Sequence, residues 1–236
     1  MDGILFNYAA SVDSVRNAVR AGLPVVAVES PVGVPGISLV EADNAAAAML
    51  GVEHLVSHGH RRIGVIAIDF EGDVNRERLR GFQNGLKIHD LTLREDLLLS
   101  LATLGLEDGY FDQAVNLAES PVAAHREFAR ALGDLLASPE PPTALFCFDY
   151  QTAVLAVRCL VEKNLVPGRD VSIIGFDCPA SVCFPRITSI SQPAAEMGAL
   201  AATLLLERIA NPRVKPRTVR LSAQLFPGET TGPAPR

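Results

Sequence analysis

Three histidines lie within seven positions of the stretch EHLVSHGHRRIG, residues 53–64. His54 and His58 are four residues apart, and His60 follows two residues later. Two histidines at this spacing share one face of a helix and can bind zinc, but a zinc site needs a third or fourth ligand. Glu53 points to another face and no cysteine is near in the sequence. We therefore expect no metal site at these histidines.

The element that carries the histidines is predicted to be a helix that begins after Asp43 and ends before Gly59, because Asp favours helix N-caps and Gly favours helix ends. Its buried stripe consists of Ala48, Val52, Leu55 and Val56. His54 and His58 are expected on the opposite face, in solvent or at a subunit contact. His60 is expected in the turn before the next strand. A cation near the C-terminus of a helix is favoured by the helix dipole.

Short apolar runs alternate with helical patterns along the chain, which is typical of stacked βαβ units. The runs are residues 3–6, 25–28, 63–68, 144–148 and 172–176. They are apolar on both faces, as parallel strands covered by helices are. The helical patterns cover residues 12–21, 44–58, 75–88, 123–137, 150–163 and 194–210. We predict an α/β fold, with a frayed end after Pro227.

The composition excludes several classes of protein. A net charge of −6 over 236 residues leaves no global basic field to hold a nucleic-acid backbone. No stretch approaches the roughly 20 apolar residues of a membrane span, and the N-terminus has no pattern of a secretory signal. The four cysteines form no CxxC pair and no zinc-ligand spacing, so we expect buried, reduced thiols.

Polar or acidic residues follow each of the five predicted strands. They are Asn7, Glu29, Asp69, Asp149 and Asp177. Open α/β sheets bind ligands outside the carboxyl ends of their strands, so these residues predict a pocket for a small polar ligand. The alternative is that each residue only caps the helix that follows it. That alternative is stronger for Asp149, where a helix begins at once, than for Asp177.

Arg78 is the other candidate for ligand binding. It lies in the first turn of a predicted helix, beside the buried stripe formed by Leu79, Phe82 and Leu86. A cation near a helix N-terminus is disfavoured unless a polar or anionic group holds it. The planar guanidinium can grip a carboxylate, a phosphate or a sugar diol. The alternative is a solvated surface arginine, like its neighbours Arg76 and Arg80.

Four segments together resemble the ligand-binding core of LacI/GalR-type transcription repressors. They are GVEHLVSHGHRRIGVIA (51–67), RLRGF (78–82), FCFD (146–149) and DVSIIGFD with PRITSISQP (170–177 and 185–193). The resemblance implies a periplasmic-binding-protein-like type I fold of two Rossmann-like lobes with parallel sheets. It implies an N-lobe of residues 1–41 and 192–221, and a C-lobe of residues 42–191 and 222–236. Two further βα units precede the first strand in that family, so the N-lobe is expected to be truncated. Residues 102–122 form a longer connection than expected, which either covers the cleft or is solvated.

The resemblance also assigns expected ligand contacts between the lobes. Arg78 takes the position of the arginine that grips the effector, and Asp177 that of the acid facing it. Phe148 stands where relatives often have a polar residue, and it either stacks on a sugar ring or base or fills the core. Less specific matches to cleft positions are Asn7, Glu29 and Gln192.

The function that the resemblance implies is that of an effector-sensing and dimerisation domain of a cytoplasmic regulator, without cofactor, metal or membrane contact. The effector is expected to be a small polar metabolite of the sugar type. DNA binding is expected only through a helix-turn-helix head missing from this chain, in a homodimer. The alternative is a solute-binding protein for sugar transport. An enzyme is disfavoured, because the sequence contains no G-x-S-x-G, P-loop, G-x-G-x-x-G or H-E-x-x-H pattern and no pairing of a cysteine with a histidine at a suitable place.

Overall fold

The computed structural model describes residues 1–7, 11–29, 33–70, 73–106, 122–178 and 185–235. Cys183 and most of the long connection at 102–122 lie outside these residues. The chain divides into two compact units, each made of two segments. The first unit is Met1–Asn44 with Gln192–Ala223, and the second is Ala45–Ser191 with Gln224–Arg236.

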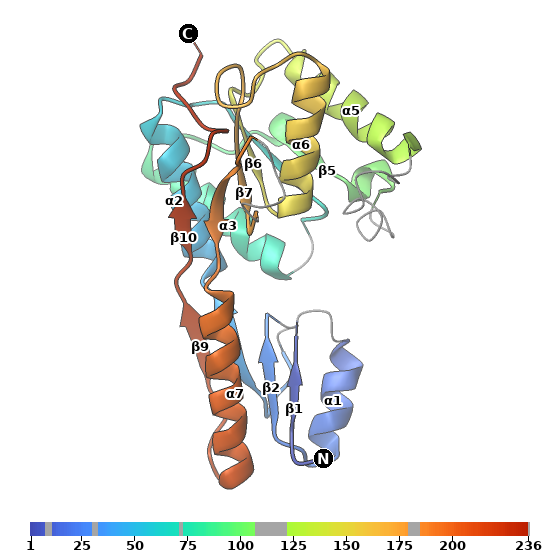
Figure 1. Ribbon diagram of the computed structural model, residues 1–236, viewed down its shortest axis with the longest axis vertical. Coiled ribbons are helices and arrows are strands. Elements are labelled where there is room, and N and C mark those ends of the chain that lie inside the picture. Colours follow the sequence, from blue (N-terminus) through green and yellow to red (C-terminus); the bar gives the residue numbers. More distant parts are fainter. Residues whose placement is uncertain (8–10, 30–32, 71–72, 107–121, 179–184, 236) are drawn as a thin grey trace. The chain divides into compact units, whose positions relative to one another are not determined.

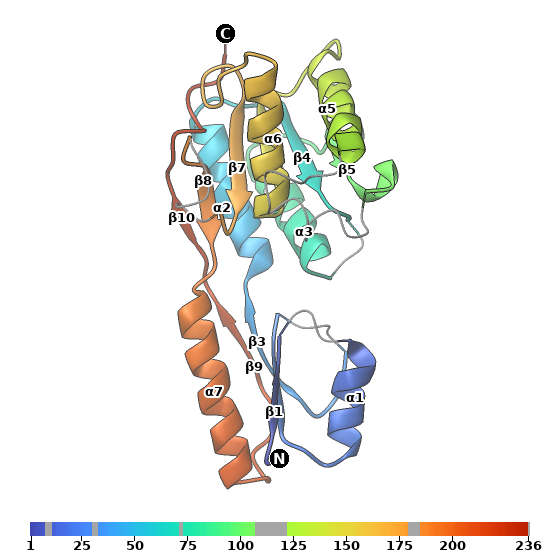
Figure 2. The same ribbon diagram turned by 45° about the vertical axis from the view of Figure 1, so that its right-hand side comes forward.

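The first unit is a parallel sheet between two helices. In sheet order its strands are β1 (Ile4–Phe6), β2 (Val25–Val28), β3 (Ser38–Ala42) and β9 (Thr218–Leu221). The helices α1 (Val12–Arg20) and α7 (Ala194–Ala210) cover opposite faces of this sheet (Figures 1 and 2). Successive side chains of β2 alternate between the faces, so Val25 packs in the core below α1 and Val26 packs in the core below α7.

The second unit contains a six-stranded sheet, in which β10 alone runs antiparallel to its neighbour among the described strands. In sheet order the strands are β10 (Gln224–Phe226), β8 (Thr188–Ser191), β7 (Ser172–Phe176), β6 (Ala144–Cys147), β4 (Ile63–Ala67) and β5 (Leu98–Ser100). The helices are α2 (Asn44–Ser57), α3 (Asp73–Ile88), α5 (Val122–Leu136) and α6 (Tyr150–Glu162). No helix among the described residues is long and apolar enough to cross a membrane.

The strands β4, β6 and β7 in the middle of this sheet are buried on both faces, and β6 shows why such a strand has an apolar sequence throughout. Leu145 belongs to the core formed with α5 and α6, which includes Phe128 and Leu160. The next side chain, Phe146, contacts Phe82 of α3 with ring centroids 5.7 Å apart. The strand therefore has no solvent-facing side, as expected for a parallel sheet covered by helices.

The α/β class with parallel sheets is confirmed, and each of the five apolar runs contains a strand: β1, β2, β4, β6 and β7. The structure adds five short strands of three to five residues, namely β3, β5, β8, β9 and β10. Short strands are hard to predict because strand propensity depends on packing against neighbours more than on the backbone itself.

The expectation of a frayed end after Pro227 is wrong. Thr230 is fully buried, its hydroxyl donates to the carbonyl of Ile173 at 2.7 Å, and it accepts from the Thr188 amide at 3.0 Å. The amide of Ile173 in turn donates to the Thr230 carbonyl at 2.7 Å. This segment is rich in Gly and Pro, but tertiary hydrogen bonds order it beside β7 and β8. We call residues 228–234 the C-terminal strap.

Candidate functional site

The carboxyl ends of three adjacent strands in the second unit carry acidic residues. Asp69, Asp149 and Asp177 follow β4, β6 and β7, which are neighbours in the sheet. Arg78 enters the same cluster from the first turns of α3. The expected concentration of polar groups at one sheet edge is therefore present within this unit.

Arg78 is buried and held on three sides. One terminal nitrogen, Nη1, donates to the backbone carbonyl of Phe148. The guanidinium carbon lies 3.8 Å from the centroid of the Phe176 ring, in a cation–π arrangement. The second terminal nitrogen, Nη2, is 3.9 Å from Oδ2 of Asp177. The protein thus fixes the plane of the guanidinium.

The alternative of a solvated Arg78 is wrong, and its neighbours on α3 make the contrast clear. Arg76 and Arg80 are exposed and form ion pairs with Asp73 and Glu77 one turn earlier on the same helix. Such surface pairs contribute little to stability. Arg78 differs because its side of the helix faces the sheet.

Asp177 has a strained backbone at the tip of β7. Its φ of 51° lies in the left-handed region, which residues other than glycine seldom adopt. The Asp177 amide donates to the carbonyl of Ile190 at 2.8 Å, which anchors this conformation to β8. Its side chain remains 40% exposed, so the carboxylate has access to solvent beside the buried Arg78. The pair offers hydrogen-bond donors and an acceptor at one place.

Asp149 is the N-cap of α6, which confirms the capping interpretation for this residue. Its Oδ1 accepts from the amide of Thr152 at 2.7 Å. The other oxygen, Oδ2, is buried and has no hydrogen-bond partner among the described residues. Burial raises the pKa of this carboxyl, against the lowering effects of the Thr152 hydrogen bonds and the Arg78 charge.

The ring of Phe148 is fully buried, which favours the interpretation that it fills the core. Its neighbours are Phe70, Phe82 and Phe146, with ring centroids 6.0, 6.5 and 5.5 Å away in edge-to-face geometry. Its backbone carbonyl, not its ring, contacts Arg78. Phe176 is the aromatic residue that the sequence reasoning missed. The sequence feature that could have identified Phe176 is its position immediately before Asp177, at the end of β7.

The remaining predicted contacts belong to the first unit. Asn7 follows β1 and is exposed, and Gln192 follows β8. Glu29 has a φ of 47°, and its carboxylate accepts from the amide of Ala42 and from Nδ2 of Asn44 at 3.3 Å. Glu29 therefore joins the end of β2 to the end of β3. The structure brings Arg78, Asp177 and the Phe148 carbonyl together within the second unit, and assigns the other three residues to the first.

The histidines of the 53–64 stretch hold the C-terminal strap. His60 is fully buried and bonds Thr143 Oγ1 at 2.9 Å, Ser172 Oγ at 2.9 Å and the Gly232 carbonyl at 3.0 Å. His54 is half-buried and forms a hydrogen bond with Thr231 Oγ1 at 2.9 Å, so it lies against the strap and not free in solvent. No local pattern in the sequence indicates these partners, which lie 83 to 177 residues away.

Burial lowers the pKa of both His54 and His60. The charge of His58 lowers both further, while the hydrogen bond to the Gly232 carbonyl opposes the shift at His60. His58 bonds the carbonyl of His54 through Nδ1 at 2.8 Å. These contacts give the three histidines a structural role.

Comparison with protein families extends the description of the fold. Residues 52–231 match the family model of the periplasmic binding protein-like domain. The repressor PurR of Mannheimia succiniciproducens is 28% identical over 230 residues, which cover 95% of this chain and 63% of the repressor. The ribose operon repressor of Haemophilus influenzae is 28% identical over 223 residues, 94% of this chain and 61% of its own length. The chain thus spans less than two thirds of these curated relatives.

Solved structures show the same architecture. A transcriptional regulator CelR–cellobiose complex is 28% identical, with a TM-score of 0.77 over 98% of this chain and 66% of that one. A regulatory protein of the LacI family from Chloroflexus aggregans is 26% identical, with a TM-score of 0.78 over 98% of this chain and 77% of that one. A ribose-bound LacI family regulator from Enterococcus faecium has a TM-score of 0.78 over 99% of this chain and 80% of that one, and its 24% identity supports the fold alone.

Proposed function

The chain belongs to the periplasmic binding protein-like domain family, and on that premise we propose that it is the effector-sensing domain of a LacI/GalR-type transcriptional regulator. Its relatives include PurR and ribose operon repressors, and the regulator CelR is solved with cellobiose. In the regulator we propose, DNA is bound by a helix-turn-helix head that is not among these 236 residues. The protein would act in the cytoplasm as a homodimer.

The observation that carries the proposal is the pair formed by Arg78 and Asp177. A buried guanidinium over the Phe176 ring presents donors at a fixed position, and a carboxylate that is 40% exposed and 3.9 Å away presents acceptors. Adjacent hydroxyls of a sugar can accept from the first and donate to the second. We therefore propose a sugar or related polyhydroxy metabolite as the effector.

Regulation follows from differential binding. A ligand that binds one conformation of the protein better than another shifts the population toward the first, and the shift is limited by the difference in affinity. No catalytic role is proposed for the acidic residues, because the relatives are repressors and the carboxylates have structural partners. Recovery of the bound ligand unchanged after long incubation would support this point.

A ligand screen tests the proposal directly. Thermal-shift measurements with ribose, cellobiose, sugar acids and nucleosides should show a rise in Tm for one class, since a ligand that binds only the folded state stabilises it by mass action. Isothermal titration with that ligand should give at least 10-fold weaker binding for Arg78→Lys and Asp177→Asn. Arg80→Lys, on the same helix but in a surface ion pair, is the matched control.

Two results would count against the proposal. Unchanged affinity in both Arg78→Lys and Asp177→Asn would remove this pair from the binding site. A nucleoside as the only ligand would overturn the sugar class but leave the regulator standing. Asn7, Glu29 and Gln192 remain predicted ligand contacts. The affinities of Asn7→Ala and Gln192→Ala for the same ligand are measured by the same isothermal titration.

The alternative function is that of a solute-binding protein for sugar transport, which has the same fold. The repressors among the relatives favour the regulator. Cell fractionation distinguishes the two functions. A regulator is expected in the cytoplasmic fraction, and a transport protein is expected on the outer side of the cytoplasmic membrane. Light scattering of the purified chain tests the proposed homodimer.

A further inference from the structure

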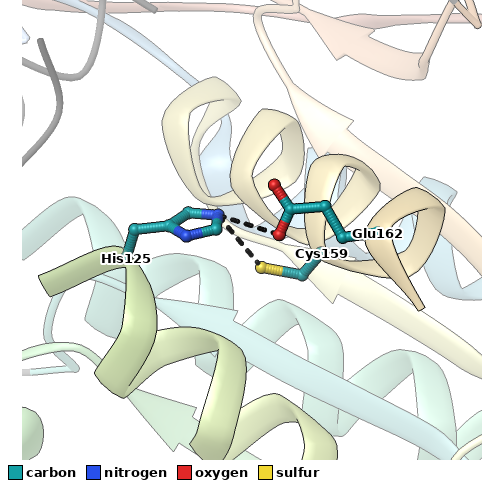
Figure 3. A group of neighbouring side chains, drawn as sticks. All are labelled: His125, Cys159 and Glu162. Atoms are coloured by element: carbon teal, nitrogen blue, oxygen red, sulfur yellow. Dashed lines mark hydrogen bonds and ion pairs between the residues drawn. The ribbon is translucent and has the colours of Figure 1, made fainter. Parts of the chain in front are cut away.

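Three side chains that commonly bind metals meet between the outer helices of the second unit. Cys159 and Glu162 lie one turn apart on α6, and His125 lies on α5 beside it (Figure 3). The group is made of residues that the Arg78–Asp177 site does not use. Its ligand atoms are the histidine Nε2, the cysteine Sγ and a carboxylate oxygen, and all lie within 4.8 Å of one another.

Two distances between the ligand atoms fit the edges of a tetrahedral zinc site. The Cys159 Sγ lies 3.7 Å from His125 Nε2, and the Glu162 Oε2 lies 3.5 Å from the same nitrogen. Zinc bonds of roughly 2.3 Å to sulfur and 2.0–2.2 Å to nitrogen and oxygen give tetrahedral edges of about 3.6 Å for N–S and 3.4 Å for N–O. These two edges therefore match a tetrahedral site, and the third, from sulfur to oxygen, is at most 4.8 Å long.

The geometry does not suit a catalytic relay. In a nucleophile–base–acid triad, the two ring nitrogens of the histidine contact different partners. Here the thiol and the carboxylate both face Nε2, as the two dashed lines in Figure 3 show. Atoms that converge on one point suit a cation better than a proton relay.

Exposure rises from the thiol to the carboxylate. The cysteine is 1% exposed, the histidine side chain 16% and the glutamate side chain 45%. An ion can therefore enter from the glutamate side, where water would complete four-coordination. The other carboxylate oxygen, Oε1, accepts from Nε of Arg158 at 3.0 Å. Such an outer contact orients a ligating carboxylate and leaves Oε2 directed at His125.

We propose that His125, Cys159 and Glu162 bind a zinc-class divalent metal ion that joins α5 to α6. One thiolate, one imidazole and one carboxylate suit zinc better than the hard cations magnesium and calcium, which take oxygen ligands. The site is independent of the effector proposed above. The sequence predicted no metal site because Cys159 has no nearby cysteine, and its histidine partner lies 34 residues away on another helix.

Cobalt titration tests the site, because a thiolate bound to Co²⁺ gives a charge-transfer absorption band. The untagged, reduced and chelator-treated full chain should develop this band with one Co²⁺ per chain, and Zn²⁺ should displace it. His125→Gln and Glu162→Gln should each weaken Co²⁺ binding at least 10-fold, and Cys159→Ser should abolish the band. The controls are His89→Gln and Cys178→Ser, which leave the three ligands intact.

A second measurement keeps the test valid if the Cys159 variant misfolds. Zn²⁺ should raise the Tm of the wild type, and should raise it much less in His125→Gln and Glu162→Gln, whose side chains are partly exposed. The proposal is overturned if the wild type gives no band with equimolar Co²⁺, or if the band survives in Cys159→Ser. It is equally overturned if folded His125→Gln binds Co²⁺ as tightly as the wild type.

Discussion

The guanidinium carbon of Arg78 lies 3.8 Å from the centroid of the Phe176 ring, inside the second unit. The contact ties the helix α3 to the end of β7, one residue before Asp177. A planar cation on an aromatic face has a fixed orientation, which a flexible lysine ammonium does not reproduce. The donors of Arg78 are thus oriented by the protein itself before any ligand binds.

Arg78→Met is expected to lower the free energy of unfolding by about 1–3 kcal/mol, because the buried carbonyl of Phe148 loses its hydrogen-bond donor. Asp177→Asn is expected to cost less than about 1 kcal/mol, since its carboxylate is 40% exposed and the ion pair is long. Urea unfolding followed by circular dichroism measures both changes. Equal losses in the two variants would contradict the asymmetry between a buried cation and its exposed partner.

Gly81 in the RLRGF segment allows α3 to approach α2 closely. A Cβ at this position would lie 2.1 Å from the backbone oxygen of Ala45, which cannot move aside as a side chain can. Gly81→Ala should therefore destabilise the protein by about 1–3 kcal/mol or more, through overpacking. Gly198→Ala is the control, because nothing lies within 4 Å of its Cβ. Alanine favours helix over glycine by up to about 1 kcal/mol, so Gly198→Ala should raise the Tm.

Much of the fold was predictable from local sequence, and the reasons are physical. A parallel strand covered on both faces must be apolar throughout, so an apolar run such as residues 63–68 predicts a buried strand. The carboxyl ends of neighbouring strands meet at one edge, so Asp149 and Asp177 could be grouped without a structure. Arg78 is a candidate because the sequence predicts a helix over 75–88, in whose first turn a cation needs a partner. The structure begins α3 at Asp73 and so places Arg78 in the second turn.

The features that escaped prediction all depend on partners far away in the chain. The C-terminal strap is rich in Gly and Pro and resembles coil until Thr230 meets Ile173 and Thr188. His60 lies between α2 and β4, as the sequence predicts, but its burial depends on Ser172 and Gly232. Neither the periodicity of apolar residues nor the spacing of neighbouring residues predicts such long-range contacts.

Asp149 allows the capping hydrogen bond to be separated from the buried charge. Asp149→Ala should cost about 1 kcal/mol, the usual value of a helix N-cap. Asp149→Asn keeps an oxygen for the Thr152 amide and removes a carboxylate whose Oδ2 has no partner among the described residues. It should therefore be as stable as the wild type or more so at pH 7, measured by urea unfolding.

The pH dependence gives an independent check on Asp149. Its pKa is raised in the folded protein, so above the ordinary value of 3.8 the folded state holds its proton longer than the unfolded state does. The free energy of unfolding of the wild type should then fall, relative to Asp149→Asn, as pH rises from 3.8 through the raised pKa. A difference between the two proteins that is independent of pH would exclude a buried ionised carboxylate as the cause.

His60 should make the C-terminal strap sensitive to acid. Its pKa is lowered from 6.5 in the folded protein, so the unfolded state binds more protons as the pH falls below 6.5. The free energy of unfolding should therefore decrease on acidification, by at most about 1.4 kcal/mol per pH unit for one such group. Above pH 7 both states are neutral at His60, and this dependence disappears.

The variant His60→Gln separates this titration from those of the other histidines. It should lose about 1–3 kcal/mol at pH 7.5, since the Thr143, Ser172 and Gly232 contacts are weakened. It should also show a shallower loss of stability between pH 6.5 and 5.5 than the wild type, whereas His89→Gln, outside these contacts, should keep the full slope. If His60→Gln retains the wild-type slope, the acid sensitivity belongs to His54, whose pKa burial also lowers, and the strap is released from its Thr231 end.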